Sequence, residues 1–141
     1  MTRRATGERH ARGVISLEFV LMLPFLLMVL LGIIDVSLIL CDKAVITNAS
    51  REAARAGVVV RVPMLTTTQV ANVALNYTQN SLITGAATTP TVNVTQANGT
   101  TSGSALTVTV TYTYTGLVLG SAFSALTGPV TVSATSVMLY E

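Results

Sequence analysis

GVISLEFVLMLPFLLMVLLGIIDVSLILC, residues 13–41, is the most apolar part of this chain and sets its architecture. Within it, Phe19 to Ile34 forms a run of 16 residues without a charged side chain. A helix needs about 20 mainly apolar residues to cross about 30 Å of hydrocarbon. Residues 14–41 meet that length, with Glu18 and Asp35 near the two ends. The stretch therefore predicts a transmembrane helix over residues 14–41.

The charges before this segment predict its orientation. Residues 1–13 contain four arginines and one glutamate, and residues 62–140 contain no charged side chain at all. Basic flanks stay on the cytoplasmic side of a membrane helix. We expect a single-pass protein of the cytoplasmic (inner) membrane, with a basic cytoplasmic leader and a periplasmic or extracellular C-terminal domain.

Composition argues against several classes of protein. Only 10% of the 141 residues are charged, against about 25% in ordinary soluble domains. The basic residues end at Arg61 and no tryptophan is present, which is a poor pattern for a nucleic-acid surface. Residues 43–141 contain no Asp, His or Cys, so no nucleophile–base pair or metal-ligand set is evident there. We expect no enzyme activity, cofactor, metal or nucleic-acid partner.

Glu18 is the most informative residue in the apolar segment. A carboxylate in a membrane helix costs about 2.5–3.5 kcal/mol on insertion scales and is functional by default. The residues around it, Gly13-Val14-Ile15-Ser16-Leu17-Glu18-Phe19, follow the basic leader. This order resembles the processing site of type IV pilin-like proteins, in which a prepilin peptidase cuts after a glycine. The resemblance implies cleavage between Gly13 and Val14, and an assembly role for Glu18, beside Phe19, in pairing with the new amine of a neighbouring subunit.

The helix is predicted to continue beyond the membrane, because no strong breaker lies between Asp35 and Gly57. Residues 42–61 would form this extramembrane continuation, and Glu52 is placed to pair with Arg55 at i, i+3. One apolar stripe recurs at spacings of four and three. Its members are Val45, Ala49, Ala53, Ala56 and Val60, of which Ala49, Ala53 and Ala56 are the expected helix-packing residues.

A narrower resemblance rests on several short motifs in order. They are the segment around Glu18, Pro24, Gly32-Ile33-Ile34-Asp35, and NASREAARAG at residues 48–57. Taken together, these motifs resemble the TadE-like family. Its members are minor pilins, or pseudopilins, of the tight-adherence (Flp) pilus system. The resemblance implies four partners: the lipid bilayer, a prepilin peptidase, other pilin or pseudopilin subunits, and the pilus assembly platform. Asp35 would mark the outer membrane interface together with Asp42 and Lys43.

Residues 62–141 are predicted to form a small uncharged α+β domain. A second helix over residues 69–82, capped by Thr66, Thr67 or Thr68, would bury Val70, Val73, Ala74 and Tyr77. Strands are expected around Val92 and Val94, over Leu106–Thr115 and over Val130–Leu139, with a short helix around Ser121–Leu126. The result is an antiparallel sheet of about three strands packed on the long helix, as in type IV pilin-like proteins. The threonines that alternate through the second strand predict a sheet surface facing solvent or another subunit.

Other functions remain open at this stage. The chain could be an uncleaved single-pass membrane protein with a small extracytoplasmic binding domain. The major fibre subunit is disfavoured because such subunits in this system are much shorter and almost all helix. A lipoprotein attached at Cys41 is disfavoured because Leu40 is too bulky for the residue before the modified cysteine.

Overall fold

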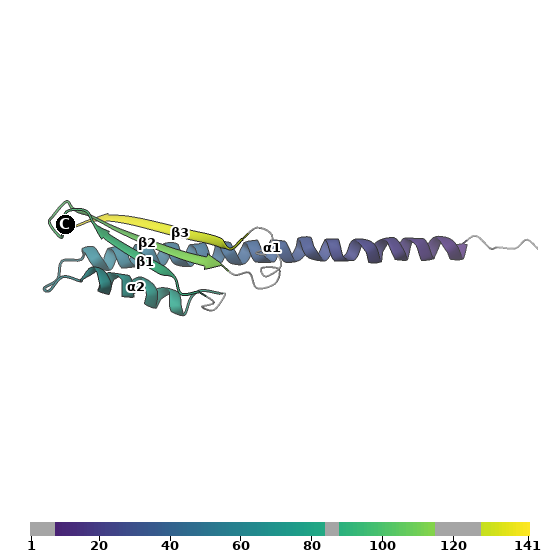
Figure 1. Ribbon diagram of the computed structural model, residues 1–141, viewed down its shortest axis with the longest axis horizontal. Helices are drawn as coiled ribbons and strands as arrows, with labels where there is room; N and C mark the ends of the chain where they lie inside the picture. The colour runs from purple at the N-terminus through teal and green to yellow at the C-terminus, as the bar shows by residue number, and fades with distance from the viewer. Residues whose placement is uncertain (1–7, 84–87, 115–127) are drawn as a thin grey trace, which may run out of the picture.

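The described part of the chain contains a long helix, a short helix and a three-stranded sheet (Figure 1). A computed structural model describes the backbone of residues 8–83, 88–114 and 128–141, and within those ranges the side chains from residue 16 onward. The order along the chain is α1 (Glu8–Val58), α2 (Thr67–Gln79), β1 (Thr91–Gln96), β2 (Ala105–Tyr114) and β3 (Val130–Leu139). This confirms the α+β fold class, while the expected short helix at Ser121–Leu126 lies outside the described residues.

The helix α1 spans Glu8–Val58 and runs through Pro24 without a break. Its 51 residues correspond to about 76 Å at 1.5 Å per residue. One half lies along the sheet, and the other half projects beyond it (Figure 1). The helix ends one residue after Gly57, so Val60 of the predicted stripe lies beyond the helix end and is 66% exposed.

The helix α2 spans Thr67–Gln79 and begins with a capping box. The Thr66 side chain accepts a hydrogen bond from the Gln69 N–H, and the Gln69 side chain accepts one from the Thr66 N–H. This confirms the expected threonine cap. The buried positions are Val70, Ala74 and Thr78, spaced four residues apart. Tyr77, expected on the buried side of this helix, is 39% exposed, and its neighbour Thr78 is buried instead.

The sheet is antiparallel in the order β1-β2-β3. Its strands are β1 at Thr91–Gln96, β2 at Ala105–Tyr114 and β3 at Val130–Leu139. β2 is central, and all ten of its residues pair with β3. Its side chains alternate strictly between buried and half-buried, which confirms the period-two pattern expected from the sequence.

The core lies between one face of the sheet and the two helices. The inward side chains of β2 are Leu106, Val108, Val110, Tyr112 and Tyr114, and they pack with the buried residues of α1 and α2. The buried face of α1 is centred on Ile46, Ala49, Ala53 and Ala54, with Val45 only half-buried. Ala49 and Ala53, in the middle of the predicted stripe, are therefore buried as expected. The buried face also includes Ile46 and Ala54, which lie beside the predicted stripe on the helix.

Candidate assembly site

The predicted processing and assembly residues all lie in the N-terminal part of α1. The backbone of Gly13 and Val14 is helical, because α1 begins at Glu8. Glu18 is exposed and has no partner among the described residues, and Phe19 is 62% exposed. The structure therefore presents Glu18 and Phe19 on the outside of a helix, available to a neighbouring molecule.

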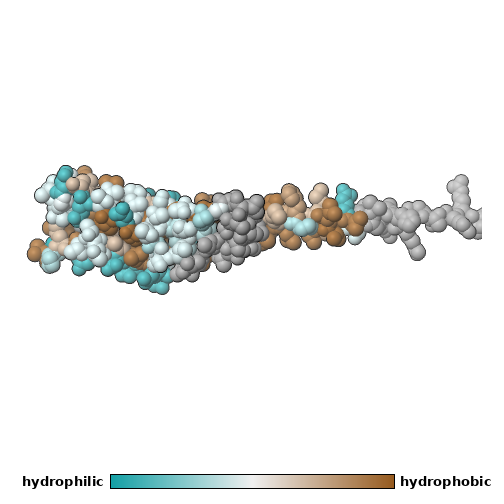
Figure 2. All heavy atoms as spheres, in the orientation of Figure 1, coloured by the Kyte–Doolittle hydropathy of each residue, from teal (hydrophilic) through white to brown (hydrophobic). Residues whose placement is uncertain are grey.

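The segment after Glu18 has no cover over most of its large apolar side chains. Between Leu17 and Ile34 these side chains include Leu21, which is 78% exposed. Figure 2 shows this apolar part of α1 outside the folded domain. Helix α1 contains, within Ser16–Val58, a segment long and apolar enough to cross a membrane by length and composition. Apolar exposure on this scale marks a surface that contacts lipid or protein, so the helix indicates association with a membrane.

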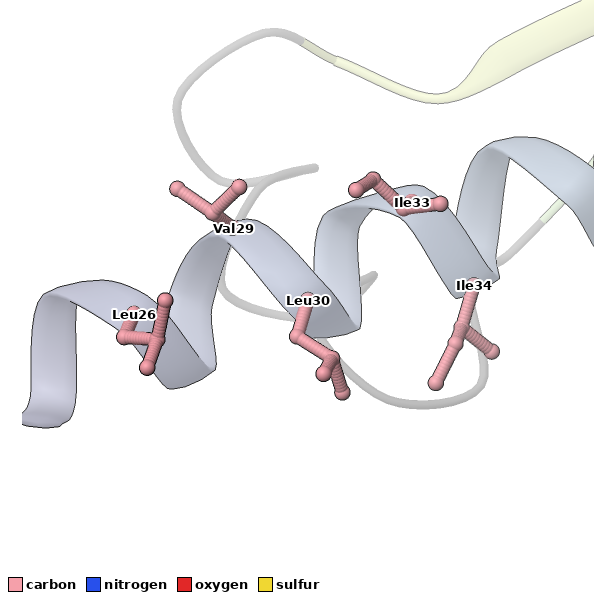
Figure 3. Close-up of a pocket in the computed structure, with 5 residues that line it drawn as sticks. All are labelled: Leu26, Val29, Leu30, Ile33 and Ile34. Atoms are coloured by element: carbon pink, nitrogen blue, oxygen red, sulfur yellow. The ribbon is translucent and has the colours of Figure 1, made fainter.

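An open apolar hollow lies on the same segment. It is lined by Leu26, Val29, Leu30, Ile33 and Ile34, at i, i+3, i+4, i+7 and i+8 of α1 (Figure 3). None of these side chains carries a polar group, so the hollow offers nothing to orient a polar substrate. It suits acyl chains or the apolar face of another helix.

The distal half of α1 forms the docking face for the rest of the chain. Ala49 and Ala53 are fully buried there, whereas Ala56 is half-buried. At the end of this face, a Cβ added to Gly57 would meet Leu106 Cδ2 and lie 3.0 Å from Val70 Cγ2. At Gly57, α1 therefore lies close against both α2 and β2, and a side chain there has no space.

Polar side chains also join α1 to the distal domain. Asp42 is fully buried, and its Oδ1 accepts a hydrogen bond from the Ile83 N–H at 2.9 Å. Nearer the projecting half, the Tyr114 hydroxyl donates to Asp35 Oδ1 at 3.3 Å. Two further contacts join Lys43 Nζ to the Ser133 carbonyl and the Ser50 hydroxyl to the Ser136 hydroxyl.

These contacts change the interpretation of three residues. Asp35, Asp42 and Lys43, which are predicted to mark the outer membrane interface, also hold α1 to the distal domain, because each forms a hydrogen bond to it. The burial of Asp42 could not be expected from its hydropathy, which predicts an exposed side chain. Its hydrogen-bond partner is a backbone amide, which the sequence does not reveal. The one available signal is the spacing of seven residues between Asp35 and Asp42, which places two acids on one helix face.

Glu52 and Arg55 form the predicted i, i+3 pair on the exposed side of α1. The Arg55 Nη2 and Glu52 Oε1 atoms are 2.8 Å apart. The hydrogen bond from Arg55 lowers the pKa of the Glu52 carboxyl, and the same bond raises the pKa of Arg55. Both groups are solvated, so this pair contributes little to stability.

Among the described side chains, from residue 16 onward, no three His, Cys, Asp or Glu side chains are grouped to hold a metal ion. Comparison with known protein families gives a match over part of the chain. The model of the family described as TadE-like protein matches residues 13–55. The match begins at the predicted processing glycine, ends within the docking half of α1, and confirms the TadE-like resemblance over this range. Neither curated proteins nor solved structures gave a match to the chain.

Proposed function

We propose, from the TadE-like match of residues 13–55, that this chain is a minor pilin or pseudopilin that takes part in assembly of a tight-adherence (Flp) pilus. That match is the observation that carries the proposal, because the matched segment includes the predicted processing site, Glu18 and most of the docking half of α1. The membrane helix and the small domain beside it fit this function. In this proposal the chain is not an enzyme, and it binds no nucleic acid.

The membrane segment in this proposal is shorter than residues 14–41. Among the described residues, the hydrogen bonds that join α1 to the distal domain start with Asp35, and Leu38 and Ile39 pack against the core. Residues 14–34 remain, which correspond to about 31 Å of helix at 1.5 Å per residue. This length equals the thickness of the hydrocarbon layer, about 30 Å. The four leader arginines support a cytoplasmic N-terminus by the positive-inside rule, with the sheet domain on the far side in this proposal.

Processing would occur between Gly13 and Val14 at the cytoplasmic face. Cleavage removes the basic leader and leaves a free amine at the start of the membrane helix. A charge in hydrocarbon is tolerated when it is paired, and exposed Glu18 supplies a carboxylate for the amine of a neighbouring subunit. Phe19 would pack beside this pair. Ala49, Ala53 and Ala56 hold the distal domain on the helix that carries Glu18.

Complementation of a strain that lacks this chain tests the proposal. We expect the strain to lose surface pili and the full-length chain to restore them. Glu18→Ala should be made and inserted but should fail to restore pili. Glu52→Ala is the matched control, since it removes an exposed carboxylate from the same helix outside the membrane segment, and it should restore them. Normal piliation without the chain contradicts the proposed function.

A further inference from the structure

The sheet has a second face that neither helix covers. It is formed by the odd-numbered residues of the three strands, and we call it the outer face. Its side chains are exposed on β1 and β3 and half-buried on β2. Eight of its thirteen positions are threonine, and the others are Asn93, Ala105, Ser133, Val137 and Leu139. The threonine row predicted for one strand thus extends across all three.

The register arranges these side chains in ranks across the sheet. Thr109 pairs with Asn93 on one side and with Thr135 on the other, and the Thr109 and Thr135 hydroxyls are 3.0 Å apart. Neighbouring strands are about 4.8 Å apart, and side chains on one face recur about every 6.7 Å along a strand. The outer face is therefore a regular surface of short side chains, with Thr109 near its centre.

Because the outer face has no charged side chains, it can pack against the outer face of a second copy without charge repulsion. No charged side chain lies between Val62 and Tyr140, so two outer faces bring no like charges together. Like charges directly opposed across a sheet are destabilising. The free side of α1 differs, because it carries the exposed Arg51 and Arg55. A contact between two identical copies therefore meets no charge repulsion at the sheet, whereas at the helix it would bring the two Arg51 side chains together.

The direction of the strands makes such a contact compatible with anchoring in one membrane. The strands lie along α1, so the outer face runs parallel to the helix axis (Figure 1). Two copies inserted in the same bilayer have their α1 helices parallel. A two-fold axis along the membrane normal then brings the two outer faces together without removing either helix from the bilayer.

The area of the face predicts a weak contact. Three strands of up to ten residues cover about 500 Å² per copy, or about 1,000 Å² for the pair, from the strand spacings. Stable interfaces bury about 1,200–2,000 Å², and smaller ones are transient. Confinement to one membrane raises the effective concentration of the partner and strengthens a weak contact.

We propose that two copies of this chain associate in the membrane through their outer faces. The threonine methyl groups of the two sheets pack together, and their hydroxyls bond across the contact or to bridging water. The inference rests on the membrane anchoring of the proposed function, and it requires neither cleavage after Gly13 nor a pilus.

Cysteine cross-linking of the full chain in proteoliposomes tests this inference. In a Cys41→Ser background, Thr109→Cys lies near the two-fold axis and meets itself across the contact. Asn76→Cys is the matched control, because Asn76 is exposed on α2. We expect at least ten-fold more cross-linked dimer from Thr109→Cys. Equal yields from the two variants, or no dimer from Thr109→Cys, overturn the inference.

A second measurement uses the native thiol and remains informative if Thr109→Cys folds poorly. Cys41 is exposed, so copies labelled there with donor and acceptor dyes report association by energy transfer. Thr109→Lys should abolish transfer while Asn76→Lys retains it, with unchanged melting of both. Equal transfer in both variants contradicts the contact. Resistance of the liposome-bound chain to alkaline extraction checks anchoring separately, and release from the membrane would overturn both the proposed anchoring and this inference.

Discussion

Replacement of Gly57 by alanine tests the packing of α1 against the rest of the domain. The added Cβ would lie closer to Leu106 Cδ2 than real Cβ atoms approach, and 3.0 Å and 3.4 Å from the two Val70 methyl groups. Leu106 and Val70 are both fully buried, so neither side chain can move aside without disturbing the core.

The expected cost follows from two opposing terms. Overpacking of a core costs about 1–3 kcal/mol. Alanine regains up to about 1 kcal/mol of helix propensity over glycine, and less here because α1 ends at Val58. We expect a net loss of about 1–2 kcal/mol in the free energy of unfolding. For a domain of about 100 residues this lowers the melting temperature by roughly 5–10 °C.

Thermal unfolding of the full-length protein in detergent, followed by circular dichroism, measures this loss. Gly32→Ala is the matched control on the same helix, because a Cβ at Gly32 meets no atom within 4 Å and should leave the melting temperature unchanged or higher. Leu106→Val removes the clashing methyl group, so the double variant should lose less than the sum of the two single losses. Additive losses, or a Gly57→Ala protein as stable as the parent, refute the close approach at Gly57.

Three further outcomes are expected from single substitutions. Asp42→Ala should lower stability in urea by about 1–3 kcal/mol, because it removes the hydrogen bond that the buried Asp42 carboxylate accepts from the Ile83 N–H, and Asp42→Asn should lose less because it retains an oxygen. Glu52→Gln should lower the melting temperature slightly at pH 7. The stabilisation from a lowered carboxyl pKa is present above the unfolded value, about 4.3, and disappears as the pH falls through the folded value; the difference between Glu52→Gln and the parent should therefore vanish in acid, and a constant difference contradicts the role of Arg55. Glu18→Ala should still be cut after Gly13, as N-terminal sequencing can check, because its proposed role comes after processing.

The sheet could be predicted from the sequence because its pattern is local. Threonine and apolar residues alternate from Leu106 to Tyr114, and this period of two fixes both the strand and its buried face. The Thr66–Gln69 capping box is equally local, since both hydrogen bonds lie within one turn of the chain. Such elements need no knowledge of the remainder of the molecule.

The buried face of α1 could not be predicted in full, because it depends on where distant segments dock. Alanines occur at several angles around the helix, so hydropathy does not select one face. Asp42 and Ser50 are buried, and their partners, the Ile83 amide and the Ser136 hydroxyl, come from residues far along the chain. The pair Tyr77 and Thr78 shows the same limit, since a small change in helix phase decides which of two neighbours is covered.

The intact mass and N-terminal sequence of the protein, purified from cells with and without a prepilin peptidase, test the central claim most directly. We predict a chain that begins at Val14 when the peptidase is present and a chain that retains the basic leader when it is absent. A chain that starts near Met1 under both conditions contradicts processing at Gly13 and favours an uncleaved single-pass membrane protein.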